Sequence, residues 1–194
     1  MKYTNELQHI VKLANDVLKI YPTFLGDWVF STFQVPMSAH LAASKDIHYD
    51  WLLPEGELPT DSSGKLESEW LESQTDVAEA LVKADNYIKK IRRTIQITWD
   101  DMIDKDAKNE HNPKLKAISL GCVKLQDKII ETMAIDQIRV HRDPPLPDDF
   151  IPEELTHMDD SEERDLRDWI FLRDSKSMLD AISQLFGHYV IDND

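Results

Sequence analysis

The sequence predicts an all-α protein. Only five glycines occur among 194 residues. Apolar residues recur at spacings of three and four, and β-branched or aromatic residues rarely alternate with polar ones, which favours helices over strands. Hydrophobic residues make up 41% of the chain, enough to bury a core, so general disorder is not expected.

A helix-turn-helix-like head is expected over residues 1–53. Asn5 is a candidate N-cap for a first helix, whose apolar positions keep helical spacing until Pro22. A second apolar run, "FLGDWVFSTF", stops before Pro36. A third short helix is expected over about residues 38–50.

Residues 54–65 are expected to form a linker, because "PEGELPTDSSG" is rich in turn-forming residues. A central helical region over 66–141 follows. We expect a long helix through about Thr94, and Thr98 with Asp101 as a capping box that starts a short acidic helix.

The clearest helix start in the chain is Asn112 as N-cap followed by Pro113 at the first helical position. Apolar residues then step by three and four, which is a heptad seam suited to packing against another helix or a second subunit. The seam consists of Leu115, Ile118, Cys122, Leu125 and Ile129.

Residues 142–160 contain "RDPPLPDDFIPEE", whose prolines predict an extended acidic linker. A C-terminal helical segment over 161–194 is expected to hold two helices, Ser161–Arg173 and Ser175–Phe186. Gly187 is expected to end the second.

Composition and motifs argue against several functional classes. The chain has no Gly-rich phosphate loop and no apolar run of membrane-spanning length, and its charged N-terminus is unlike a signal peptide. The single cysteine, Cys122, lies on the apolar seam, which favours a buried thiol over a nucleophile. The local group His157–Asp160 is a poor metal site, because it does not fill a coordination shell. We therefore expect a cytoplasmic protein that is not an enzyme and uses no cofactor or metal.

Charge is unevenly distributed in a chain of formal net charge -15. Residues 50–79 and 142–174 each carry a balance of -8, whereas residues 80–141 carry +3. The positive region includes a cluster of cations opposite an apolar stripe on a helical wheel. Three interpretations stay open: a solvated face with an Asp85–Lys89 pair, pairing with the acidic segment 148–163, or contact with a phosphate or protein partner. The cluster consists of Lys89, Lys90, Arg92 and Arg93.

The order of parts resembles phage small terminase subunits. "TFLGDWVFSTFQVPMSAHLAASKDIHYDWL" resembles their helix-turn-helix, and "EWLESQTDVAEALVKADNYIKKIRRTIQITWDDMIDKD" with "NPKLKAISLGCVKLQDKIIE" resembles the helices that follow it. The resemblance covers about residues 23–135 and implies a homo-oligomeric ring that binds duplex DNA and meets a large terminase motor subunit in the host cytoplasm.

Carried onto this chain, the resemblance implies a recognition helix over Ser38–His48. It has one lysine and no arginine, so cations elsewhere would supply the phosphate contacts, with ring avidity compensating. The implied DNA-binding residues are Lys12, Lys19, Ser38, His40, Ser44, Lys45, Lys89, Lys90, Arg92 and Arg93.

An alternative follows from the charge alone. An acidic α-helical interaction protein, such as an immunity protein or an inhibitor that mimics nucleic acid, would use the two acidic segments to attract a basic partner.

Overall fold

A computed structural model describes residues 3–105, 109–135 and 150–191. The described residues are helical, with one isolated β-bridge between Thr60 and Leu66 and no strand, so the all-α prediction is confirmed. The helices are α1 (Thr4–Leu18), α2 (Tyr21–Phe33), α3 (Met37–Ser44), α4 (Ser68–Ser73), α5 (Val77–Lys105), α6 (Asn112–Ile135), α7 (Glu153–Thr156) and α8 (Ser161–Ile191).

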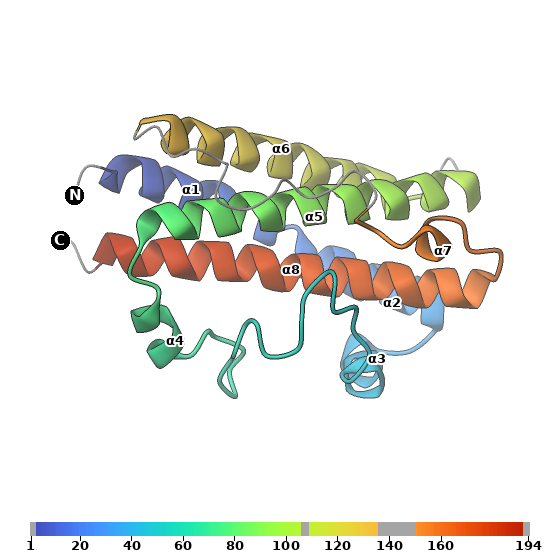
Figure 1. The fold of residues 1–194 in the computed structure, drawn as a ribbon. Coiled ribbons are helices and arrows are strands. Elements are labelled where there is room, and N and C mark those ends of the chain that lie inside the picture. The colour runs from blue at the N-terminus through green and yellow to red at the C-terminus, as the bar shows by residue number, and fades with distance from the viewer. Residues whose placement is uncertain (1–2, 106–108, 136–149, 192–194) are drawn as a thin grey trace.

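Four helices form the main body of the molecule. α1 packs on α8 and α6, and α5 packs on the same two helices (Figure 1). Each of these neighbours runs antiparallel to the next, because α1 and α5 run in one direction and α6 and α8 in the other. This is the arrangement of an antiparallel four-helix bundle.

α2 continues the side of the bundle that α1 begins, and it also packs on α8 (Figure 1). Pro22 stands in the first turn of α2, where its missing N–H removes no helical hydrogen bond. Helical structure is interrupted between Leu18 and Tyr21, and α1 and α2 placed end to end are about as long as α8.

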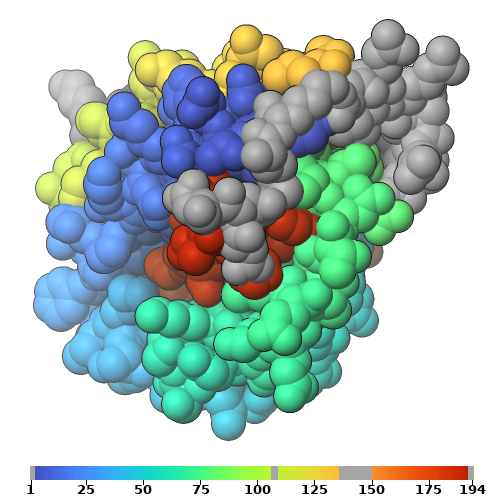
Figure 2. Space-filling view, turned by 90° about the vertical axis from the view of Figure 1, so that its left-hand side faces the viewer, coloured from blue at the N-terminus to red at the C-terminus, as the bar shows by residue number. Residues whose placement is uncertain are grey.

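The core is one continuous cluster that includes side chains from Tyr3 in the N-terminal segment to Tyr189 near the end of α8. The predicted head, residues 1–53, therefore contributes α1, α2 and Leu52 to the same core as the central and C-terminal helices. Seen from the end of the bundle, α8 lies between α1, α5 and the segment that carries α4 (Figure 2). Four consecutive α8 residues, Trp169 to Leu172, are fully buried, which fits a helix covered on several sides.

Three predicted helix breaks are wrong. α8 runs without interruption from Ser161 to Ile191, through both Ser175 and Gly187. Ser175 is fully buried, with its hydroxyl 3.3 Å from that of Thr94 on α5. α5 likewise continues to Lys105, and the hydroxyl of Thr98 donates to a buried carboxylate on α8 instead of capping a new helix.

Aspartates begin both of these long helices. The Asp76 carboxylate accepts from the N–H of Ala78 at 2.8 Å, and the Asp160 carboxylate accepts from the N–H of Glu162 at 2.8 Å. Both are N-cap interactions that satisfy otherwise unpaired donors of the first turn.

The segment between α3 and α5 crosses the edge of the bundle formed by α8 (Figure 1). Gln184 of α8 accepts a hydrogen bond from the N–H of Leu66 at 2.9 Å, and the Tyr189 hydroxyl donates to the Gln74 carbonyl at 2.6 Å. The predicted linker, residues 54–65, thus leads into a segment that is tied to α8. Among the described helices none is long and apolar enough to cross a membrane.

Candidate interaction surface

The basic cluster of α5 makes contacts mainly within its own chain. Lys89 pairs with the buried carboxylate of Asp85 at 2.5 Å, which confirms the predicted pair. Lys90 donates to the Leu52 carbonyl at 2.9 Å, and burial lowers the pKa of its ammonium group.

Of the two arginines of the cluster, Arg92 contacts a neighbouring helix and Arg93 faces solvent. Arg92 donates to Gln126 of α6 at 2.5 Å, and the Gln126 amide donates to Asp85 at 2.9 Å. The only described cation of the cluster without a hydrogen bond or ion pair is the exposed Arg93. Lys89 therefore compensates a buried carboxylate and Arg92 joins α5 to α6, so three of the four cations take part in contacts within the chain.

The predicted recognition helix is shorter than expected and is bound to α8. α3 ends at Ser44, so the expected helix Ser38–His48 is wrong over its last turn. Ser44 is buried, and its hydroxyl accepts from the Trp169 indole N–H at 2.8 Å while donating to the His40 carbonyl. The His40 ring stacks on Phe33 with centroids 4.0 Å apart, and burial lowers the pKa of His40.

Arg173 of α8 holds the end of α3 in place. Its guanidinium donates to the carbonyls of Ser44 at 2.8 Å and Ile47 at 2.7 Å, and to the Asp174 carboxylate at 2.7 Å. Of the four predicted DNA-binding residues in this region, only Ser38 and Lys45 are exposed.

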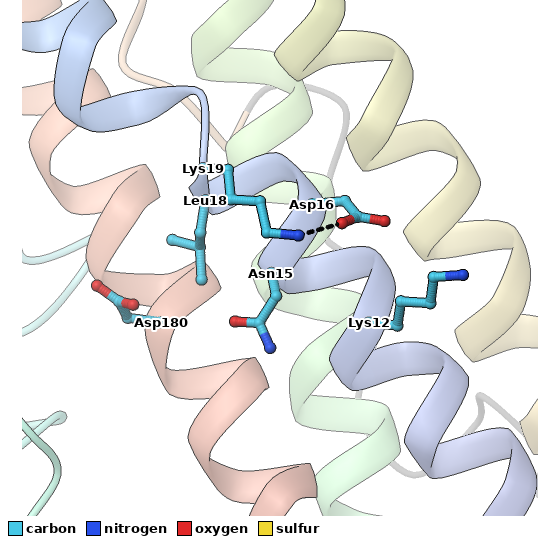
Figure 3. Close-up of a pocket in the computed structure, with 6 residues that line it drawn as sticks. All are labelled: Lys12, Asn15, Asp16, Leu18, Lys19 and Asp180. Carbon is cyan, nitrogen blue, oxygen red and sulfur yellow. Dashed lines mark hydrogen bonds and ion pairs between the residues drawn. The ribbon is translucent and has the colours of Figure 1, made fainter.

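Lys12 and Lys19 line an open hollow of about 530 Å³ between α1 and α8 (Figure 3). Lys19 pairs with Asp16 at 2.8 Å, and Asp180 on the opposite wall pairs with Lys176 at 2.5 Å. Both signs of charge therefore occur in the hollow, and no concentrated positive charge results.

The heptad seam of α6 is packed inside the single chain. All five positions have 0% exposure, and α6 packs on α5 and α1. The first of the two predicted alternatives, packing against another helix, therefore holds for these side chains, and this face is not available to a second subunit. Burial raises the pKa of the Cys122 thiol to about 12, which makes it a poor nucleophile.

Exposed carboxylates dominate two segments. Between Asp46 and Glu79 the only cation is Lys65, and between Glu153 and Asp165 the only lysine or arginine is Arg164. The Trp51 ring of the first segment contacts that of Phe150, just before the second, with centroids 5.8 Å apart, whereas α4 and α7 lie near opposite ends of α8 (Figure 1). Exposed carboxylates that pair with no lysine or arginine among the described residues are Asp46, Asp50, Glu55, Asp61, Glu67, Glu69, Glu72, Asp76, Glu79, Glu153, Glu154, Asp159, Asp160, Glu162 and Glu163. We call these two segments the acidic surface.

A buried ion network stands behind this surface and was not predicted. Arg167, fully buried, donates to Asp101, to Asp168 at 2.6 Å and to the Leu155 carbonyl at 2.7 Å. It thereby ties α5, the end of α7 and α8 together. Burial raises the pKa of Asp168 to about 6. The Arg-Asp pair directly before an apolar run was the available sequence signal, but its partners are 12 to 66 residues away.

A serine and a histidine also meet at this end of the bundle. The Ser31 hydroxyl donates to the Trp28 carbonyl at 2.9 Å and lies 3.1 Å from Nε2 of His111. Nδ1 of His111 has no hydrogen-bond partner among the described residues. No third group among the described residues therefore orients the His111 ring as the acid of a catalytic triad does, and the pair lacks that part of an activated nucleophile.

No group of three His, Cys, Asp or Glu side chains in the described ranges is placed to hold a metal ion. No protein-family model, curated protein or solved structure matches the chain.

Proposed function

We propose that this protein is a non-catalytic, acidic α-helical interaction module that binds a basic protein partner through the acidic surface. The observation that supports this most is a contrast between the two signs of charge. Three of the four cations of the α5 cluster bind groups of their own chain, one of them a carboxylate, whereas most carboxylates of the acidic surface pair with no lysine or arginine among the described residues.

Electrostatics favours such a partner. Uncompensated charges of one sign create a potential that attracts an oppositely charged protein and raises its association rate, and salt screens that attraction. The acidic surface is also held on a fixed frame, because Gln184 and Tyr189 of α8 bind the segment around α4 and Arg167 binds the end of α7. Little ordering of the backbone would then be needed on binding. An immunity protein or a nucleic-acid-mimicking inhibitor would fit this description.

A second candidate is the DNA-packaging adaptor of the small terminase type, which would bind duplex DNA and present it to a motor subunit. The observation that favours it is the α2–turn–α3 unit, in which Gln34 takes the left-handed conformation at φ 57° between two helices. In this candidate the phosphate contacts would fall to Arg93, Lys45 and Lys12. Both candidates would act in the cytoplasm, that of the host cell if a phage encodes the chain.

One titration separates the candidates. The protein is added to fluorescein-labelled octa-arginine and, separately, to a labelled duplex of about 20 base pairs, and anisotropy is followed at about 50 and 300 mM salt. We expect the peptide to bind with an affinity that falls as salt rises, and the duplex not to bind. Binding of the duplex but not the peptide would overturn the proposal in favour of the adaptor.

The charge-reversal variant Lys89→Glu/Arg93→Glu extends the test to the α5 cluster. An adaptor that uses the cluster should lose DNA affinity and show a flatter salt slope. For the acidic module we expect peptide affinity to stay the same or rise slightly, because the variant adds negative charge. A loss of peptide affinity without unfolding would contradict the proposed surface.

A further inference from the structure

α6 has a second face that α1 and α5, the described helices packed on it, do not cover. Leu120, Ile130 and Ile135 are 54%, 46% and 43% exposed, whereas the seam on the opposite side of the same helix is fully buried. Exposed large apolar side chains on one helix indicate an interaction site when they share a line along the helix.

Leu120 and Ile130 share such a line, whereas Ile135 lies outside it. Steps of four, three, four, three and four residues place the outer residues on one stripe, which is the spacing by which helices pack side by side. The stripe consists of Lys116, Leu120, Val123, Asp127, Ile130 and Ala134.

The charged residues on the outer face of α6 indicate that its partner is a second copy of this chain. Lys116 on the stripe and Lys124 beside it lie N-terminal to residue 125, and Asp127 on the stripe lies C-terminal to it; all three are exposed and without an ion pair among the described residues. A second α6 laid antiparallel, with the two-fold axis near residue 125, brings Leu120 against Ile130 of the other copy and Lys124 close to Asp127 of the other copy. The symmetry makes each contact twice.

The position of α6 also suits contact between copies. Two chains of net charge -15 repel each other, and the acidic surface would strengthen that repulsion at any interface that includes it. α6 lies at the edge of the bundle opposite α3 and α4, and it belongs to residues 80–141, whose balance is +3 (Figures 1 and 2). Contact at this edge brings two copies together with the least electrostatic repulsion between their acidic groups.

We propose that the outer face of α6 is a homodimer interface in which two copies pair antiparallel. This inference goes beyond the proposed function and does not rest on it. A single helix face buries less than the roughly 800 Å² per partner of a stable interface, so the dimer should dissociate on dilution. The dimer leaves both acidic surfaces facing outward.

Sedimentation velocity of the full chain from about 1 to 500 µM tests the interface. We expect the mass to rise from monomer towards dimer and no further, since an isologous contact closes at two. A monomer throughout, or a mass beyond the dimer, would overturn the proposal. Leu120→Glu/Ile130→Glu should remain monomeric with unchanged helicity by circular dichroism. Ile103→Glu, an equally exposed isoleucine on α5, should dimerise like the wild type.

A charge exchange tests the antiparallel register. Lys124→Glu and Asp127→Lys should each weaken the dimer about tenfold, because each places like charges opposite one another. The double variant Lys124→Glu/Asp127→Lys should recover wild-type dimerisation, since both residues of each pair are then exchanged in both copies. Absence of recovery in the folded double variant would overturn the proposed pairing.

Discussion

Gly121 of α6 offers a direct measurement of how closely α1 and α6 approach. A Cβ atom added at Gly121 would lie 2.4 Å from Cγ2 of Val17, and Val17 is only 3% exposed. Carbon atoms in contact are normally about 3.5–4.0 Å apart, so Gly121→Ala would force Val17 or a helix to move by about 1 Å. Val17 is β-branched and buried, which limits its choice of rotamers.

The expected magnitude follows from two opposing effects. Overpacking of this kind costs about 1–3 kcal/mol, while alanine is favoured over glycine inside a helix by about 1 kcal/mol. Gly26→Ala in α2 and Gly187→Ala in α8 are matched controls, because an added Cβ at either meets nothing within 4 Å. We expect the controls to stabilise by about 0.5–1 kcal/mol and Gly121→Ala to be less stable than either by about 1–3 kcal/mol.

Urea unfolding followed by circular dichroism measures all three variants. Val17→Ala should make Gly121→Ala stabilising in the double variant, because the alanine at 17 removes the obstructing methyl. If Gly121→Ala stabilises the wild-type background as much as Gly187→Ala does, the close approach of α1 and α6 is wrong.

Three further predictions concern α8 and the core. Arg173→Met removes the donors to the Ser44 and Ile47 carbonyls. Hydrogen exchange should therefore rise over residues 37–47 but not over α6, and the free energy of unfolding should fall by about 1–3 kcal/mol. Unchanged exchange over residues 37–47 would contradict the role of Arg173 in holding the end of α3. Burial raises the pKa of Asp168 from 3.8 to about 6, so its ionisation destabilises the folded state as pH rises through this window, and the stability of Asp168→Asn relative to wild type should rise between pH 4 and 7; a pH-independent difference would refute this. The Cys122 thiol, buried with a pKa of about 12, should react with a disulfide reagent only after unfolding, and rapid reaction of the native chain would disprove its burial.

Local signals predicted those features that depend on neighbours in sequence. α6 begins at Asn112 with Pro113 in its first turn, one residue before the expected start, since first-turn preferences act within a few residues. The expected N-cap is wrong, because the His111 carbonyl accepts the first helical N–H groups and the Asn112 side-chain oxygen caps none. The Asp85–Lys89 pair was predicted because residues four apart lie on one side of a helix.

Features set by distant partners were not predictable in this way. Gly187 usually favours a helix end, but α8 continues past it to the buried Tyr189, so packing outweighs the local preference. The α5 cations appeared free because their partners, the Leu52 carbonyl and Gln126, are 34 or more residues away. Ser44 likewise appeared to face DNA because nothing near it in sequence indicates Trp169.

The central claim is that the acidic surface, and not the total negative charge, binds a basic partner. Two variants with the same loss of four negative charges test it. One neutralises the acidic surface with Glu69→Gln, Glu72→Gln, Glu153→Gln and Glu154→Gln. The other neutralises α1 and α6 at the opposite edge with Glu6→Gln, Asp16→Asn, Asp127→Asn and Glu131→Gln.

The measurement is the affinity of each folded variant for octa-arginine at about 50 mM salt. We expect the acidic-surface variant to lose affinity about tenfold, since each exposed charge contributes a few tenths of a kcal/mol, and the opposite-edge variant to lose less than about twofold. Equal losses in the two variants would show that only net charge matters and would contradict the claim.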